Sequence, residues 1–180
     1  DALHMMGIVA EGPASLDWNE RAIARAQASR SERARSWLGA LFNNTGMSYL
    51  EMQDYQRALD LFRQGQAWRE EQDERRGDGK TTVPTFIARW PVARALRGLG
   101  RHDEALAILR QLEGDRAEAD LPEDGYVAEE LGENLLERGQ PEEARPHFAR
   151  AATLLGQDPW FAEHEAARLA RLRQLGGEVQ

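Results

Sequence analysis

The chain has 180 residues, a net charge of −8 and no cysteine. Its length suits about one domain, with enough apolar surface to form a core without a metal or disulfide. The lack of cysteine excludes disulfide frameworks, thiolate zinc sites and cysteine nucleophiles. The acidic balance argues against binding to nucleic acid or to an anionic membrane, because both need many cationic contacts. No secretion signal or membrane-length apolar stretch occurs, so we expect a cytoplasmic protein.

The first clear pattern covers residues 36–75 approximately. Gly46 is followed by Tyr49 three residues later, and Ala58 is followed by Phe62 four residues later. Apolar residues at spacings of three, four and seven lie on one face of a helix. We therefore predict a helix–turn–helix unit in which Gly46 and Ala58 are the small residues where the two helices cross.

The same pattern recurs twice with the same internal spacing. The second copy (about 85–113) contains Ala93, Leu96, Ala105 and Leu109, and the third (about 125–156) contains Gly132, Leu135, Ala144 and Phe148. The spacing inside each copy is constant while the distance between copies varies, which indicates a repeated structural unit with insertions. Pro91 and Pro146 fall inside predicted helices and each removes one backbone hydrogen bond, so we expect a kink or a delayed start at both.

Two charged insertions separate the copies. In Glu70–Pro84, we predict that the first part extends the preceding helix and that Gly77–Pro84 forms a loop. Glu113–Gly125 is acidic and contains Pro122 and two glycines. Segments of this composition are usually exposed, so we expect both insertions to be solvated connectors.

The pattern resembles the tetratricopeptide repeat (TPR), whose signature is a helix pair with small and aromatic contacts. The resemblance implies an all-α fold, a TPR-like right-handed superhelix of antiparallel helix pairs, as a single domain over residues 1–180. It also implies a degenerate repeat at about 1–30, with Leu3, Met6, Gly7 and Ala10 on its first helix and Trp18, Ala22 and Ala26 on its second. A capping helix is expected at about 159–175, because a stack of repeats must end in a polar face.

Sequence motifs argue against catalysis. There is no G-x-S-x-G nucleophile elbow and no phosphate-binding loop, and Gly77–Thr81 lacks both the first glycine and the preceding strand that such a loop needs. The four histidines are far apart and none lies in an H-E-x-x-H motif; they are His4, His102, His147 and His164. We therefore predict a protein that is not an enzyme, with no catalytic residue, no metal site and no cofactor.

The resemblance implies that the first helices of the pairs line a concave groove, and counting from each small residue gives the side chains that face it. Three positions before it lie Asn43, Trp90 and Glu129, and one position after it lie Met47, Arg94 and Glu133. These positions are not needed for the core between helices. We therefore predict that these six residues contact a partner.

Each of these features has an alternative interpretation. Asn43 and Arg94 match two of the five positions of the TPR carboxylate clamp, whereas His4, Ile8 and Trp90 depart from it; Asn43 could instead bond a neighbouring helix backbone. Trp90 is either a partner anchor or a side chain packed on the insertion loop. Glu129, Glu133 and Glu137 repel one another at four-residue spacing, so Arg94 and Arg97 or a basic partner must offset their charge.

The sequence therefore predicts a non-catalytic scaffold that binds a protein or peptide in its groove. The alternative is a sensory or assembly segment of a larger transcriptional or signalling regulator, and self-association into a homodimer is a further option. The identity of the partner is not encoded in any motif that we recognise.

Overall fold

The computed structural model describes residues 13–177, with side chains from Leu16 onward, and every regular element in that part of the chain is helical. The first-helix positions predicted at Leu3, Met6, Gly7 and Ala10 lie outside it. Contacts between residues divide the chain into two compact units, 1–99 and 100–180. The expectation of a single domain stays a prediction, and the two units are described separately.

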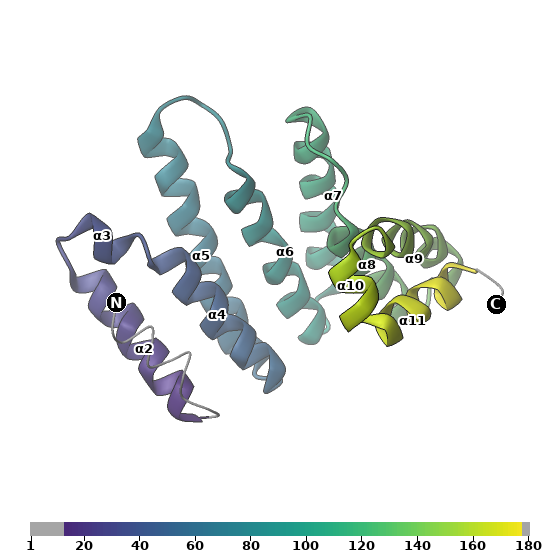
Figure 1. The fold of residues 1–180 in the computed structure, drawn as a ribbon, viewed down its shortest axis with the longest axis horizontal. Helices are drawn as coiled ribbons and strands as arrows, with labels where there is room; N and C mark the ends of the chain where they lie inside the picture. Colours follow the sequence, from purple (N-terminus) through teal and green to yellow (C-terminus); the bar gives the residue numbers. More distant parts are fainter. Residues whose placement is uncertain (1–12, 178–180) are drawn as a thin grey trace. The chain divides into compact units, whose positions relative to one another are not determined.

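The first unit is a row of packed helices (Figure 1). Its described elements are α2 (Pro13–Ala28), the short α3 (Glu32–Arg35), α4 (Leu38–Glu51), α5 (Tyr55–Arg76) and α6 (Val83–Gly98). Helix α4 packs against α2 and α5, and α5 packs against α6. Ala22 and Ala26, both predicted for the second helix of the first pair, are buried against Leu41 and Phe42 of α4.

Small residues set the closeness of α4 and α5, as predicted. A Cβ atom on Gly46 would lie 2.4 Å from the Phe62 ring, which leaves no room for a side chain. The same helix pair has two further close approaches that the sequence did not indicate. Gly65 faces Phe42, and Gly39 faces Trp68. In these three contacts the residue number rises along α4 while it falls along α5. The two helices are therefore antiparallel along their whole contact.

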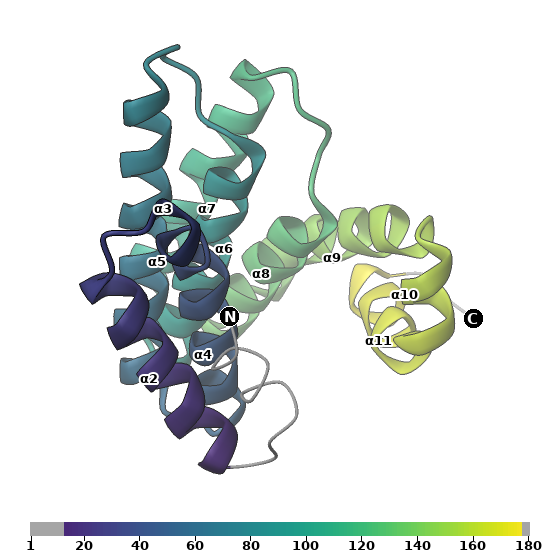
Figure 2. The ribbon, with the colours of Figure 1, turned by 60° about the vertical axis from the view of Figure 1, so that its left-hand side comes forward.

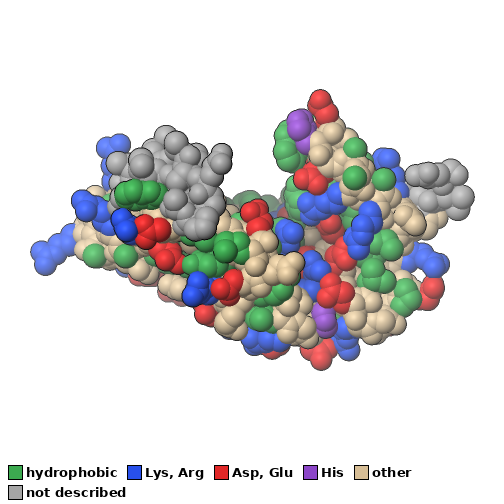
Figure 3. All heavy atoms as spheres, turned by 90° about the horizontal axis from the view of Figure 1, so that it is seen from below, with side chains coloured by type: hydrophobic (Ala, Val, Ile, Leu, Met, Phe, Trp, Pro, Cys, Tyr) green, Lys and Arg blue, Asp and Glu red, His purple; other side chains and the backbone are tan. Residues whose placement is uncertain are grey.

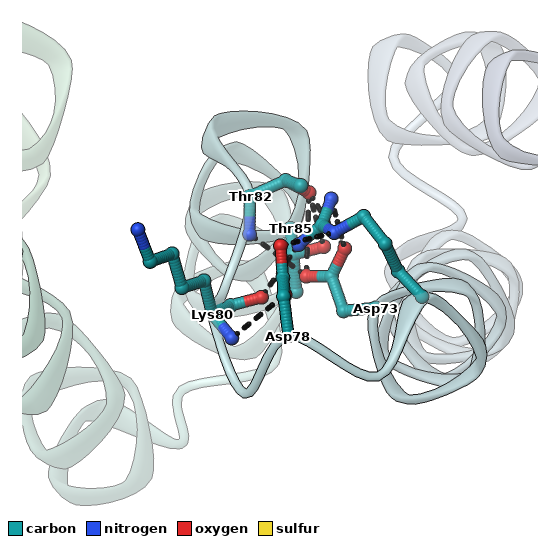
Figure 4. Close-up of polar contacts among 6 residues, drawn as sticks. Asp73, Asp78, Lys80, Thr82 and Thr85 are labelled. Carbon is teal, nitrogen blue, oxygen red and sulfur yellow. Dashed lines mark hydrogen bonds and ion pairs between the residues drawn. The ribbon is translucent and has the colours of Figure 1, made fainter.

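The connection between α5 and α6 is held by a polar network (Figure 4). The Asp73 carboxylate accepts hydrogen bonds from the Thr82 backbone N–H (2.8 Å) and hydroxyl (3.0 Å), which ties the end of α5 to the start of α6. Arg76 donates to Asp78 (2.9 Å) and to the Lys80 carbonyl (2.7 Å). The prediction that this insertion extends a helix and then forms a loop is confirmed, and the loop has a defined internal structure.

The second unit contains α7 (His102–Glu118), α8 (Gly125–Glu137), α9 (Pro141–Gly156), α10 (Pro159–His164) and α11 (Ala166–Gly176). Helices α8 and α9 form its central antiparallel pair, in which Gly132 lies against the Phe148 ring. Figure 2 shows α10 and α11 folded beside α9. The predicted capping helix is thus interrupted at Glu165 and forms two helices.

Two expectations about the connections need correction. Glu113–Glu118 is not a solvated connector but the last part of α7, and its Arg116 is buried and donates to the Pro122 carbonyl (2.8 Å). Pro91 and Pro146 lie within α6 and α9, so neither proline delays the start of its helix, and the kink stays a prediction. No helix among the described residues is long and apolar enough to cross a membrane.

Candidate functional site

A cavity of about 260 Å³ opens between α4, α5 and α6 of the first unit. We call it the α4–α6 cavity. Its lining combines small and apolar side chains with three polar ones; the residues are Gly39, Ala40, Asn43 and Asn44 of α4, Phe62, Gly65 and Arg69 of α5, and Pro84, Ile87, Ala88 and Pro91 of α6. A concave site with apolar walls and a few polar groups is the usual form of a ligand pocket.

Helix α6 contributes a row of exposed and half-buried side chains beside the cavity, which we call the exposed row. Val83 and Ile87 are its most exposed members, at 46% and 52%. Trp90 and Arg94 follow at three and four residues, so all four lie on one face of the helix. The Arg94 guanidinium lies 5.4 Å from the centre of the Trp90 ring, a cation–π distance.

Arg69 is the only cation that lines the α4–α6 cavity. Its guanidinium lies beside Gly39, where a Cβ atom would come within 3.0 Å of it, so a glycine at this point of α4 makes room for the charge. Burial lowers the pKa of Arg69 and the nearby Asp73 carboxylate opposes that shift. Asp73 itself is engaged by Thr82 and Arg76, and among the described residues no carboxylate forms an ion pair with Arg69.

The four predicted site residues of the first unit lie on the helices that border the cavity. Asn43 lines it and is half-buried; its amide donates to the Asn44 side chain (3.3 Å), not to a neighbouring helix backbone in the described part of the chain. Met47 is half-buried on α4, one turn further on. Trp90 and Arg94 lie on the exposed row of α6. His4 and Ile8, which belong to the clamp comparison, fall outside the described residues.

The two predicted residues of the second unit are engaged by the last helix. The buried Glu129 carboxylate accepts two hydrogen bonds from Arg168 of α11, at 2.7 and 2.6 Å. Glu133 accepts from both terminal nitrogens of Arg171, one of them at 3.0 Å. Burial lowers the pKa of Arg168, but the hydrogen bonds and charge of Glu129, together with Glu165 and Tyr126, outweigh burial and raise the pKa overall. At Glu129 and Glu133 the repulsion within the glutamate row is therefore offset by α11, and not by Arg94 and Arg97 as expected.

The second unit has a cavity of its own, of about 340 Å³, between α7, α9 and the loop before α8. Its cations are already paired. Arg150 pairs with Glu113 and lies 3.7 Å from Glu123, and Arg116 lies 3.6 Å from Asp124. These contacts attach the loop to the helices. The arginines of this cavity therefore serve the fold of the unit.

Sequence reasoning missed Arg69 and Ile87. Counting one more turn back from Ala93 would have reached Ile87 on the same helix face as Trp90. Arg69 lies in the extension of α5 beyond the repeat pattern, and its position against Gly39 depends on how two helices cross. No local pattern in the sequence indicates that contact.

The described residues form helix pairs that stack through small residues, which defines a helical repeat protein. Residues 44–75 match the model of the tetratricopeptide repeat family. The match begins inside α4 and ends at the end of α5, so it covers the crossing of Gly46 and Phe62. The resemblance predicted from the sequence is confirmed: this chain contains a tetratricopeptide repeat.

Solved structures share this fold over most of the chain. MamA AMB-1 is 23% identical with a TM-score of 0.56 and aligns with 84% of this chain and 70% of that chain. Nearly identical TPR-like repeats of a kinesin light chain from Podosopora anserina are 20% identical (TM-score 0.58; 91% and 78% covered). The Rap conjugation gene regulator of plasmid pLS20, solved with the Phr* peptide, is 15% identical (TM-score 0.67; 92% and 44%).

These likenesses show the fold, and the predicted all-α, TPR-like array of helix pairs is confirmed. This chain spans less than half the length of the Rap regulator. The comparison with curated proteins gives no match.

Proposed function

We propose that this chain is a non-catalytic module that binds a protein or peptide through the α4–α6 cavity and the adjoining row of α6. The observation that carries the proposal is the cavity itself, where exposed Ile87 lies opposite Asn43 in a recess also lined by Arg69. An aliphatic side chain and a cation in one recess can hold an apolar and a polar group of the same ligand.

Of the six predicted contacts, we retain Asn43, Met47, Trp90 and Arg94 for the partner. We assign Glu129 and Glu133 to the attachment of α11, because both carboxylates are already paired with its arginines. The MamA and Rap likenesses support a binding role by fold alone. No observation on residues 13–177 favours the alternative of a sensory or assembly segment, and a homodimer and a cytoplasmic location stay predictions.

Capture of partners followed by surface mutation tests this assignment. Trp90→Ala combined with Arg94→Ala is expected to weaken binding of a captured partner at least about tenfold, as loss of a buried aromatic anchor does. The single variant Ile87→Ser, at a side chain that is half exposed, should weaken it without disturbing the fold.

Trp160→Ala is the matched control, because Trp160 is 56% exposed on α10 of the other unit. It should leave binding unchanged while far-ultraviolet circular dichroism verifies that every variant is folded. Equal binding by the groove variants and the wild type would contradict the assignment of the site.

A further inference from the structure

Arg69 of the α4–α6 cavity lies outside any ion pair in the described part of the chain. It is half-buried against Gly39, and its neighbouring carboxylate, Asp73, bonds Thr82 and pairs with Arg76. Two arginines of the second unit, Arg168 and Arg171, are by contrast paired with carboxylates. A partly buried cation that makes no direct ion pair is held at a cost that a ligand carboxylate would reduce.

A second polar feature lies on the opposite wall. Pro91 has no backbone N–H, so it cannot donate to the Ile87 carbonyl as a residue four positions later normally does. Both residues line the cavity. The Ile87 carbonyl therefore lacks its usual donor within the helix. Asn43 and Asn44, whose amides use only one of their N–H donors between them, offer donors on the facing wall.

The apolar part of the site runs past the cavity along α6. From Val83 to Arg94 the row extends about 16 Å at 1.5 Å per residue, whereas the cavity-lining residues of α6 span only Pro84 to Pro91. A peptide that follows the row therefore continues past the cavity at both ends. The carboxylate at Arg69 would therefore come from a side chain within the peptide and not from its C-terminal end.

The net charge of the first unit, which is nearly neutral, does not oppose an acidic ligand. The first unit has 14 basic and 13 acidic residues, whereas the second has 9 basic and 18 acidic residues. Figure 3 shows charges of both signs interspersed with small apolar patches on the face drawn, without one broad field of either sign. At physiological salt, charges beyond roughly 8 Å are largely screened, so the ligand is selected by local groups and not by the net charge.

We propose that the α4–α6 cavity binds an internal segment of an acidic partner peptide, in which an Asp or Glu side chain pairs with Arg69 and a neighbouring aliphatic residue packs on Ile87. This proposal rests on the proposed function and deepens it, since it names the chemistry of the ligand. Arg69 supplies a planar guanidinium that can donate two parallel hydrogen bonds to a carboxylate. Ile87 and Pro84 supply the apolar surface beside it.

The probe is a phage-displayed library of random dodecapeptides joined to the coat protein at their C-terminal ends, so that no free carboxylate terminus is present. A parallel library displays the same peptides with free C termini. The wild-type chain is expected to enrich peptides with Asp or Glu next to an aliphatic residue from the first library. Replacing that acidic residue by its amide should weaken binding about tenfold or more, the effect of losing a charged hydrogen bond.

Two variants locate the interaction. Arg69→Met keeps an unbranched side chain but removes the charge, and it should bind the acidic peptide and its amide equally weakly. Arg63→Met is the matched control, because Arg63 is an exposed arginine of the same helix outside the cavity. It should discriminate between the peptides as the wild type does. Circular dichroism and the thermal midpoint show whether both variants are folded.

The Trp68 indole reports where the peptide binds. Its ring lies against Gly39 beside Arg69, and its N–H is buried without a hydrogen-bond partner. The indole signal in a ¹H–¹⁵N spectrum, identified with Trp68→Phe, should shift when the acidic peptide is added. A bound peptide that leaves this signal in place would overturn the assignment to the cavity.

The remaining outcomes separate the two proposals. Peptides that need Ile87 but show no preference for acid over amide, or a preference that Arg69→Met retains, overturn the carboxylate proposal and leave the binding function standing. Enrichment only from the library with free C termini shows that the carboxylate comes from a chain end and overturns the internal-segment assignment. Failure of both libraries to yield any binder overturns both proposals.

Discussion

The two units are built on the same kind of helix pair, but they differ in which of their charged side chains form ion pairs. In α4 and α8, Asn43 and Glu129 occupy equivalent positions, three residues before the small residue. Asn43 lines an open cavity next to Arg69, which forms no ion pair with the residues that the structure describes, whereas Glu129 is buried under Arg168. The comparison shows that the position in the repeat sets the direction of a side chain. Contacts with the neighbouring helix then determine whether that side chain is available to a partner.

The largest expected loss of stability comes from a substitution where α4 and α5 cross. Gly46→Leu should destabilise the first unit by about 3 kcal/mol or more, because the added side chain meets the Phe62 ring in a close-packed core. Urea unfolding followed by circular dichroism measures the loss. Gly114→Leu is the control, since nothing lies within 4 Å of a Cβ atom at that position of α7. Similar unfolding midpoints for the two variants would show that the crossing is not close-packed.

Replacing an arginine by methionine should change the stability of the two units by different amounts. Arg168→Met leaves the buried Glu129 carboxylate without its partner, and we expect a loss of about 1 to 2 kcal/mol after allowing for the partial exposure of Arg168. Arg69→Met removes a half-buried charge that makes no direct ion pair within residues 16–177, so stability should stay within about 0.5 kcal/mol or rise. Chemical denaturation of both variants measures the difference.

Glu129→Gln combined with Arg168→Met completes a double-mutant cycle. The double variant should lose less stability than the sum of the two single variants, because it contains neither of the two charges and so leaves no buried charge unpaired. A loss in Arg69→Met as large as that in Arg168→Met would mean that Arg69 has a structural role, and the contrast between the units would fail.

A smaller effect concerns pH and His147 of α9. Burial lowers the pKa of this imidazole, and repulsion from Arg110 lowers it further. The unfolded chain, with a histidine pKa of about 6.5, therefore binds a proton first as the pH falls, and stability declines from pH 6.5 down to the folded-state pKa. His147→Gln should flatten the decline between pH 7.5 and pH 5.5 in denaturant titrations. An unchanged slope would place the pH dependence elsewhere in the chain.

Much of the helical framework could be predicted from local patterns. The spacing of Gly46, Ala58 and Phe62 depends on helix periodicity, which any segment of the chain displays by itself. Gly77 at the end of α5 and Pro141 at the start of α9 mark helix ends for similar local reasons. The candidate site was predicted only in part, because Asn43 and Trp90 follow from counting along a helix but their neighbours on other helices do not.

The sequence by itself determined the helix pairs α4–α5 and α8–α9 and the glycines at their crossings, since these depend on spacing within one segment. Only the tertiary structure decided that α11 pairs with Glu129 and Glu133, that Arg69 lies against Gly39, and that Asp73 is used to hold α6. The physical reason is that these charges interact with groups far away in the sequence. Whether the two groups come within bonding distance depends on how the helices pack.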